Sequence, residues 1–302
     1  MKPILSLRDF ARRIGTPIGR LKQIADEIES HYRQFSVRDE KTQKVRQFRN
    51  PSPELKEIHR RINRIILSIA DISSIAHGGV AGKSTRSNAG QHLGQPCVIN
   101  VDVKQFFPNV RHYVVYRLFR GELGFGRDVA RLLTRLTTLH SELPQGAPTS
   151  TTIANILLSS AVDAPVAIES SALNAVTTRF VDDFTFSGRD PRSLINTTAK
   201  ALSARRLPIW RKKSKFQTKA KLKITPLSQR QEVTGLVVNS RHGASVSRKR
   251  RDAVRAAIYQ LKNISDETLK RKALNSIRGK IAYVCGFNPG SAARLQRYTE
   301  SR

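Results

Sequence analysis

Three aspartates stand where short apolar runs of this sequence end. Asp102 follows the run 97–101, and Asp182 and Asp183 follow the β-branched run 175–181. Each aspartate alone is ordinary, because Asp is common in turns and at caps. Together they could meet at one end of neighbouring strands, where carboxylates offer the hard oxygen ligands that Mg²⁺ prefers. Two such ions clamp the attacking and leaving oxygens of a phosphoryl transfer, so the pattern predicts a nucleotidyl transferase.

A second segment suited to ligand binding lies between these aspartates, the Pro- and Gly-rich stretch 143–150. Pro144, Gly146 and Pro148 shape a turn that leads into a helix start rich in Ser and Thr. Such a turn brings backbone N–H groups close to a bound ligand, and it also contains the side-chain amide of Gln145. Taken alone, the stretch is equally a plain capped helix start.

The charge of the chain points to a polyanionic partner. Its 302 residues carry 54 Lys and Arg against 23 Asp and Glu, a net charge of +31. Residues 1–100, 101–200 and 201–302 carry +9, +2 and +20, so both ends are basic and the middle is nearly balanced. Basic residues that neutralise phosphates release counterions and give strong, salt-sensitive binding. We therefore expect nucleic acid to be held around an acidic centre.

Composition excludes several other classes of protein. With 39% hydrophobic residues the chain is not typical of disorder, and no run approaches about 18 uncharged apolar residues, so we expect no membrane span or membrane partner. The first ten residues place charges where a signal peptide needs an apolar stretch. Cys97 and Cys285 are too few for a disulfide scaffold or a Cys-rich zinc site and fit a reducing compartment, so we expect a cytoplasmic protein.

The hydrophobic pattern predicts an α+β chain that brings the aspartates together. Apolar residues at helical spacing and helix-start signals predict helices at about 7–30 (broken at Gly15), 53–70, 111–139, 149–161, 191–206 and from 246 to the end. Strand-like runs are predicted at 97–101, 175–181 and 232–238. A basic hairpin at 31–49 and a Gly- and Ser-rich loop at 77–94 are also predicted, and both precede these runs. The run 175–181 continues beyond Asp182 and Asp183 in alternation, which predicts a tight hairpin with both carboxylates at its tip.

Taken in order, these motifs resemble the palm motifs of reverse transcriptases. The resemblance rests on Asp102 followed by Phe106 and Phe107, on the loop 143–150, and on Phe180-Val181-Asp182-Asp183. It implies a right-hand polymerase with a small antiparallel palm sheet and a helical thumb. N-terminal helices and fingers would occupy 1–94, with the basic hairpin at about 31–49; the palm, with some fingers elements, would occupy 95–240, and the thumb 241–302.

Two further elements resemble the bacterial retron branch of this family. Asn88 and His92 match an N-A-x-x-H element, and 233–235 match a V-T-G element. The resemblance implies RNA-directed DNA polymerisation on a cognate structured non-coding RNA, primed from an internal guanosine 2′-OH. The product would be a branched, RNA-linked single-stranded DNA (msDNA), made from dNTPs. It also implies a role in anti-phage defence with a separate effector protein.

The resemblance assigns roles to individual residues. Asp102, Asp182 and Asp183, helped by the backbone of Val103, would bind two Mg²⁺ ions. Phe107 matches the aromatic that excludes a 2′-OH, and the nucleotide-binding residues would be Arg46, Phe107, Gln145, Gly146 and Val181. Lys213 would protonate the departing pyrophosphate, with Lys212 as a rival in register. The usual Tyr-Ala before the paired aspartates is replaced by Phe180-Val181, which leaves both carboxylates in place.

RNA contacts are expected from the two retron elements and from the basic C-terminal helices. The predicted RNA-binding residues are Asn88, His92, Val233, Thr234, Gly235, Arg248, Arg250, Arg251 and Arg255. For Asn88 and His92 a structural hydrogen-bonding role is an equal alternative, and a charged helix face can also be merely solvated.

The sequence disfavours three other interpretations. Residues 78–85 resemble a Walker A loop, but that loop needs glycine where His77 stands, and no clear strand precedes it. Another prokaryotic reverse transcriptase, of the group II intron or diversity-generating type, is disfavoured by the V-T-G element. A non-catalytic RNA-binding scaffold that restrains an effector is disfavoured by the three retained aspartates.

Overall fold

A four-stranded antiparallel sheet, with the strand order β4-β5-β3-β6, forms the centre of the molecule. The computed structural model describes residues 2–38, 45–103, 105–207, 222–240 and 243–300. The sheet contains β3 (Cys97–Asp102), β4 (Val176–Phe180), β5 (Asp183–Gly188) and β6 (Lys223–Pro226). The strands predicted at 97–101 and 175–181, and the tight hairpin between β4 and β5, are confirmed.

Alternation along β3 and β5 gives this sheet two buried faces. Val101 pairs with Phe184 and Ile99 with Phe186, and these four side chains belong to the main hydrophobic core. Val98, on the opposite face, belongs to a second core that continues into the C-terminal helices. Both faces of β3 and β5 are therefore covered by core residues, whereas the edge strand β6 is exposed at Lys223, Ile224 and Pro226.

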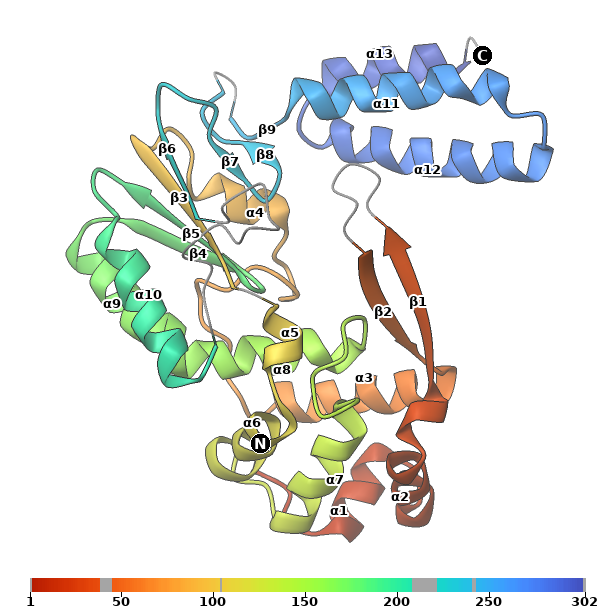
Figure 1. The fold of residues 1–302 in the computed structure, drawn as a ribbon, viewed down its shortest axis with the longest axis vertical. Helices are drawn as coiled ribbons and strands as arrows, with labels where there is room; N and C mark the ends of the chain where they lie inside the picture. Colours follow the sequence, from red (N-terminus) through yellow and green to blue (C-terminus); the bar gives the residue numbers. More distant parts are fainter. Residues whose placement is uncertain (1, 39–44, 104, 208–221, 241–242, 301–302) are drawn as a thin grey trace.

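Helices surround the sheet and form the base of the molecule (Figure 1). The break predicted at Gly15 is confirmed, since Gly15 ends the first helix with a left-handed backbone at φ 65°. The α-helices that precede β6 in the described chain are α1 (Leu7–Ile14), α2 (Ile18–Asp26), α3 (Pro53–Leu67), α4 (Thr85–Gly90), α5 (Phe106–Asn109), α6 (His112–Arg117), α7 (Arg127–Thr137), α8 (Pro148–Leu158), α9 (Ala164–Ala172) and α10 (Ser193–Ala204). Short π-helical segments at Leu118–Glu122 and Ser159–Asp163 extend α6 and join α8 to α9.

Part of the stretch predicted as the loop 77–94 is helical, because it contains α4. The start of α4 is capped reciprocally: Ser84 Oγ accepts from Ser87 N, and Ser87 Oγ accepts from Ser84 N. This capping box uses Ser where Glu or Gln is usual, and the helix is only six residues long. Its hydrophobic spacing was therefore too short to be recognised as helical.

The basic hairpin predicted at 31–49 is confirmed as β1 (Tyr32–Arg38) and β2 (Val45–Pro51). The strands pair in register from Tyr32 opposite Pro51 to Arg38 opposite Val45. Phe35 and Phe48 stack across the hairpin with ring centroids 5.6 Å apart. In Figure 1 the hairpin rises from the helical base toward α12.

The strand predicted at 232–238 is wrong in one respect: the structure splits it into a tight hairpin. β7 (Glu232–Val233) pairs with β8 (Leu236–Val237), and β8 pairs with β9 (Ser245–Val246). Thr234 and Gly235 form the turn, with φ of 47° and 79°. Positive φ at both central residues reverses the chain, so the V-T-G element is a turn and not a strand centre.

Three helices form a C-terminal group with its own core. They are α11 (Arg248–Gln260), α12 (Glu267–Cys285) and α13 (Pro289–Glu300), with a short 3₁₀ turn at Leu261–Asn263. Val254, Ile258, Ile277, Ile281 and Leu295 pack together in that core. Figure 1 shows this group beyond the sheet and hairpin, at the opposite end from α1, α2 and α7.

One helical run in the described part of the chain, Pro148–Ala172, is long and apolar enough to cross a membrane by length and composition alone. Because this run is rich in Ser and Thr and includes charged residues, it is not the run of about 18 uncharged apolar residues that the sequence was expected to lack. The run corresponds to α8, the π-helical segment and α9, and more than half of it is buried inside the fold. It also carries Asp163, whose buried carboxylate is paired with Arg179. Burial of this kind is typical of a core helix.

Candidate active site

The three predicted aspartates meet at one end of the central sheet. Asp102 is the last residue of β3 and pairs directly with Asp183, the first residue of β5. Asp182 occupies the turn before Asp183, and Val103 N donates a hydrogen bond to Asp182 O at 3.2 Å. Residues opposite each other in an antiparallel pair have Cβ atoms roughly 4.5–5.5 Å apart. The backbone thus places three carboxylates within reach of one another.

These carboxylates lie at the surface end of the sheet. Asp183 is exposed, and Asp102 and Asp182 are partly buried. In the described part of the chain no three His, Cys, Asp or Glu side chains are gathered tightly enough to hold a metal ion as they stand. Rotation about the two side-chain bonds of Asp changes where each carboxylate points without moving the backbone. The oxygen donor set fits a hard divalent cation, and the backbone supplies the placement.

Phe107 lies beside this end of the sheet in α5, the short helix that follows β3. Its ring is partly buried and meets the buried ring of Phe106 edge to face, with centroids 5.5 Å apart. Gln105 turns the chain into α5 with a left-handed φ of 45°. The predicted role of Phe107 beside the incoming sugar stays a prediction.

The loop 143–150 packs against the basic hairpin. Arg49 N, in β2, donates to Gln145 O at 2.9 Å. A Cβ added to Gly146, whose φ is 115°, would lie 3.0 Å from Arg49 O. Only glycine therefore fits this approach. Arg49 also binds Glu142 at 2.8 Å, which ties the hairpin to the start of the same loop.

Three of the predicted site residues lie wholly or partly outside the described structure. Arg46 lies in β2 opposite Val37, but its side chain is outside the described part. Lys212 and Lys213 both fall within the undescribed residues 208–221. Their predicted roles in gripping the triphosphate and protonating pyrophosphate stay predictions.

Asn88, His92 and Val233 are fully buried, which corrects their prediction as RNA-contacting residues. His92 bridges β4 and β5, with Nδ1 2.7 Å from Ser187 Oγ and Nε2 2.7 Å from Thr178 Oγ1. A side chain without exposed surface cannot touch RNA. The structural hydrogen-bonding alternative fits His92. It does not fit Asn88, because both polar atoms of its side-chain amide are buried without a hydrogen-bond partner.

The other predicted RNA-binding residues lie at or near the surface around the β7–β8 turn and on α11. Thr234 is partly buried, and Gly235, Arg248, Arg250 and Arg255 are exposed. Arg250 stacks over Tyr283 at 4.7 Å, and Arg255 stacks over Tyr298 at 5.0 Å. Arg251 is partly buried and donates to Ser291 Oγ at 2.6 Å, so it joins α11 to α13. The exposed arginines present fixed cations beside aromatic rings, a combination suited to nucleic acid.

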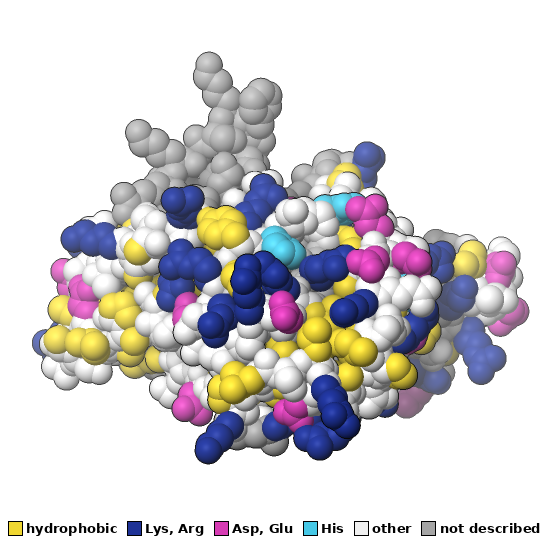
Figure 2. Space-filling view, turned by 90° about the horizontal axis from the view of Figure 1, so that it is seen from below, with side chains coloured by type: hydrophobic (Ala, Val, Ile, Leu, Met, Phe, Trp, Pro, Cys, Tyr) yellow, Lys and Arg dark blue, Asp and Glu magenta, His cyan; other side chains and the backbone are white. Residues whose placement is uncertain are grey.

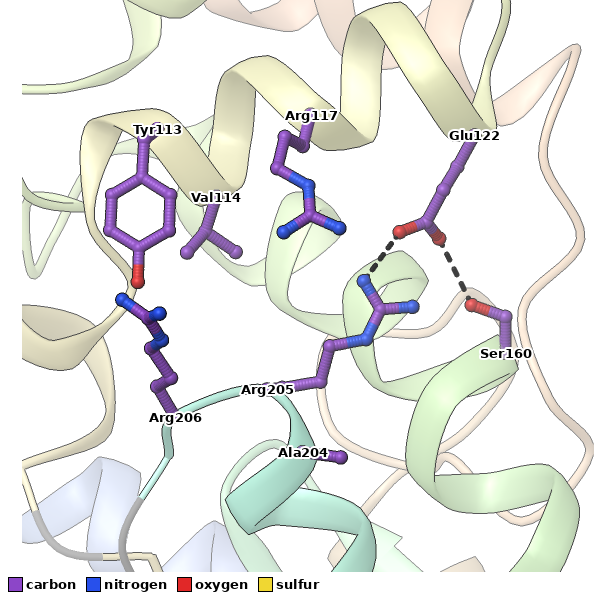
Figure 3. Close-up of a pocket in the computed structure, with 8 residues that line it drawn as sticks. All are labelled: Tyr113, Val114, Arg117, Glu122, Ser160, Ala204, Arg205 and Arg206. Carbon is purple, nitrogen blue, oxygen red and sulfur yellow. Dashed lines mark hydrogen bonds and ion pairs between the residues drawn. The ribbon is translucent and has the colours of Figure 1, made fainter.

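Basic side chains are spread widely over the molecule. Figure 2 shows the face at the helical base, where Lys and Arg are interspersed with acidic and apolar side chains. A cavity of about 480 Å³ lies between α6 and the end of α10, where Glu122 binds both Arg205 and Ser160 (Figure 3). None of the predicted site residues lines this cavity.

Sequence reasoning missed one group of residues behind the aspartates. Arg179 and Asp163 form an ion pair whose side chains are both 0% exposed. Burial raises the pKa of the Asp163 carboxyl, and the two hydrogen bonds from Arg179 act in the opposite direction. Arg179 sits in the strand run before Phe180-Val181-Asp182-Asp183, where an arginine among β-branched residues was the available signal.

Similarity to known proteins agrees with this geometry. The family described as "Reverse transcriptase (RNA-dependent DNA polymerase)" matches residues 37–239. Retron Mx65 reverse transcriptase from Myxococcus xanthus is 31% identical over 97% of this chain and 71% of its own length. Retron Se72 reverse transcriptase from Salmonella heidelberg is 34% identical over 51% of this chain and 41% of its own length. Retron Ec86 reverse transcriptase from Escherichia coli is 27% identical over 98% of this chain and 89% of its own length.

Proposed function

The chain belongs to the retron reverse transcriptases, and from this membership we propose that it copies part of a cognate structured non-coding RNA into branched, RNA-linked single-stranded DNA. As a member of this family it is an RNA-directed DNA polymerase. Its reaction joins a primer hydroxyl to the α-phosphate of a dNTP. Priming from an internal guanosine 2′-OH would give the branched product, msDNA.

The observation that carries the proposal is the register of β3 against β5. It places Asp102 opposite Asp183 and brings Val103 N onto the carbonyl of Asp182. Three carboxylates from two strands thereby share one end of a rigid sheet. This arrangement suits a polymerase and would have no use in a simple RNA-binding scaffold.

Asp102, Asp182 and Asp183, with the carbonyl of Val103, would hold the divalent ions, which we propose are two Mg²⁺. When bound, such ions neutralise charge on the phosphates and activate the attacking hydroxyl. The chain's own residues orient the reactants. Phe107 would limit the space at the sugar 2′ position, and Gln145, Gly146 and Val181 would line the nucleotide. Arg46 would grip the triphosphate, and Lys213 or Lys212 would donate a proton to pyrophosphate.

We assign the parts of a right hand to the elements of this fold. The N-terminal helices α1–α4 and the hairpin β1–β2 would be the fingers region, at 1–94. The central sheet with α8–α10 would form most of the palm, at 95–240, and α11–α13 the thumb, at 241–302. The second hydrophobic core, which holds α11–α13 together, supports a separate thumb, whereas the first core is continuous across the proposed boundary between fingers and palm.

The proposed partners follow from the same assignment. A cognate RNA and its DNA copy would occupy the basic surfaces, and a separate effector protein would be controlled by the complex in anti-phage defence. We propose that these events occur in the cytoplasm.

Nucleic acid bound to the protein tests this function. The protein is purified from a host that carries its native locus, and the bound nucleic acid is digested with RNase. We expect a discrete single-stranded DNA that is lost in Asp182→Asn and in Asp183→Asn, because both carboxylates are needed for nucleotidyl transfer. Asp128→Asn is the control, since Asp128 is an exposed residue of α7.

Two results would contradict the proposal. Abundant bound RNA with no DNA in the wild type would favour the non-catalytic scaffold. DNA of many unrelated sequences, instead of one discrete species, would favour another kind of prokaryotic reverse transcriptase.

A further inference from the structure

The turn that carries Asp182 has an unusual backbone. Phe180 pairs with Asp183, so Val181 and Asp182 alone form the turn between β4 and β5. Val181 has a φ of 61°, in the left-handed region. Hairpins favour glycine at such a position, and a β-branched residue there is an outlier. A strained residue of this kind persists only where its surroundings fix it.

Arg179 supplies one of the contacts that fix this turn. Its Nη1 donates to Val181 O at 2.8 Å and thereby holds the peptide group that joins Val181 to Asp182. The rest of the guanidinium is anchored in the interior. Nε and Nη2 donate to the two carboxylate oxygens of Asp163 at 2.8 and 2.6 Å, and Nη1 also donates to Asn155 Oδ1 at 2.8 Å.

The glycines of the Walker A-like segment close the other side of the turn. His77 N donates to Arg179 O at 2.7 Å, and Asn155 Nδ2 donates to Gly78 O at 2.9 Å. A Cβ added to Gly78 would lie 2.6 Å from Val181 N. Only glycine allows this backbone to pass so close to the turn.

We propose that Arg179, Asp163, Asn155 and Gly78 are positioning residues that hold Val181 in its left-handed conformation and so place Asp182 and Asp183 for the reaction. We call these four residues the turn brace. The inference rests on the proposed polymerase function and extends it to residues that do not touch the substrates. A buried ion pair contributes little net stability, whereas its bond to Val181 O bears directly on the catalytic turn.

The first variant removes both charges together, so that neither is left unpaired in the core. Arg179→Met combined with Asp163→Leu keeps apolar volume at both positions. We expect this variant to fold and to bind primer–template as the wild type does. The kcat for dNTP addition should fall about 100-fold, as expected for a displacement of about 1 Å at a reacting group, with KM for dNTP changed less than about threefold.

A mutant cycle with Val181→Gly separates positioning from plain stability. Glycine adopts a positive φ without strain, so a turn carrying this substitution needs the brace less. When Val181 is kept, we expect the Arg179→Met, Asp163→Leu pair to lower kcat about 100-fold. When Val181→Gly is also present, the same pair should lower kcat no more than about fivefold. The variant that carries Val181→Gly alone provides the reference rate for the second comparison.

A matched control is available at the cavity in Figure 3. Arg205 binds Glu122 at 2.6 Å without contacting the turn. Arg205→Met with Glu122→Leu should leave kcat within about twofold and show no coupling to Val181→Gly, because distant sites act additively.

The proposal is overturned if the folded brace variant keeps the wild-type kcat. It is also overturned if the variant loses the same factor in both Val181 backgrounds, because the brace then does not act through the turn. If the double variant does not fold, Arg179→Lys takes its place: one ammonium can pair with Asp163 but cannot also reach Val181 O, so the same loss and the same coupling are expected. Failure of the polymerase proposal is recognised separately, since the wild type would then extend no primer.

Discussion

Residues of one type do different work here according to where the fold places them. Asp183 ends at the solvent edge of the sheet, whereas Asp163 is buried and held by two hydrogen bonds from Arg179. The exposed carboxylate of Asp183 lies where solvent can reach it, whereas the enclosed carboxylate of Asp163 acts through Arg179. Burial likewise distinguishes two histidines from the others, since His59 and His92 have no exposed surface.

Phe107 gives a prediction at the level of one side chain. Under the role proposed for Phe107, alanine in its place would open space at the sugar 2′ position. The ratio of ribonucleotide to deoxyribonucleotide incorporation should then rise about 10- to 200-fold, the range of discrimination by an apolar pocket. Single-nucleotide addition with matched rNTP and dNTP measures this ratio. Phe106→Leu is the control, because Phe106 is buried and should affect stability only. An unchanged ratio in Phe107→Ala would refute the role of Phe107.

The two buried histidines predict how stability depends on pH. Burial lowers the pKa of His59 to about 4 and of His92 to about 3. Unfolded histidine titrates near 6.5, so below that pH the unfolded chain binds protons that the folded chain refuses. The free energy of unfolding should therefore fall with acidification from about pH 6.5 to 4, by about 1.4 kcal/mol per pH unit for each histidine.

Urea unfolding at several pH values between 7 and 4 measures this slope. His59→Gln and His92→Gln should each reduce this slope. A slope unaffected by either buried substitution would show that other groups control acid unfolding.

At the level of elements, the short turns and hairpins are harder to predict from the sequence than the long helices. The β7–β8 hairpin was missed because Thr234 is β-branched and favours a strand, and because a single glycine within a strand pattern usually signals a bulge. The tight hairpin at Asp182-Asp183 was predicted correctly, because alternating apolar residues resume directly after two residues that suit a turn. Local spacing thus identifies a turn only where side-chain types agree with it.

Substitution of two glycines, one in the β7–β8 turn and one in a helix, tests the turn assignment. Gly235 has a φ of 79°, which alanine adopts only with strain, so Gly235→Ala should lower the free energy of unfolding by about 1 kcal/mol. Gly279 lies within α12 with open space where a Cβ would be added, so Gly279→Ala should raise it by about 0.5–1 kcal/mol. Thermal or urea unfolding of the two variants tests the opposite signs. Destabilisation of equal size in both would contradict the turn assignment.

At the level of the whole molecule, charge and architecture match. In Figure 1 the sheet, the β1–β2 hairpin and the α11–α13 group surround one region, and the aspartate end of the sheet lies toward it. The strongly basic last third of the chain supplies α11–α13, while the nearly balanced middle supplies the sheet. A basic surround and an acidic centre are what a polymerase needs to hold nucleic acid near metal-binding carboxylates.

RNA affinity should therefore fall steeply with salt. Removal of one phosphate contact lowers the slope of log K against log salt by about 0.7–0.9. Arg248→Ala and Arg255→Ala should each lower the slope by about this amount, since both residues are exposed on α11. Arg12→Ala is the matched control, because its side chain is 80% exposed on α1 at the other end of the molecule. Equal effects of all three would show that only net charge matters.

The sequence by itself determined the family, the main strands and hairpins, and the three aspartates, because these depend on local spacing and on motifs that keep their order along the chain. Tertiary structure decided which polar residues are buried and which are exposed. Nothing in the local pattern told a buried Asn88 or His92 from an exposed one, since burial depends on which sheet face α4 covers. The turn brace likewise joins residues from three separate segments, the loop at Gly78, the helical run with Asn155 and Asp163, and β4 with Arg179. Only folding lets Asn155 and Asp163 hold the guanidinium of Arg179 so that it donates to the carbonyl of Val181.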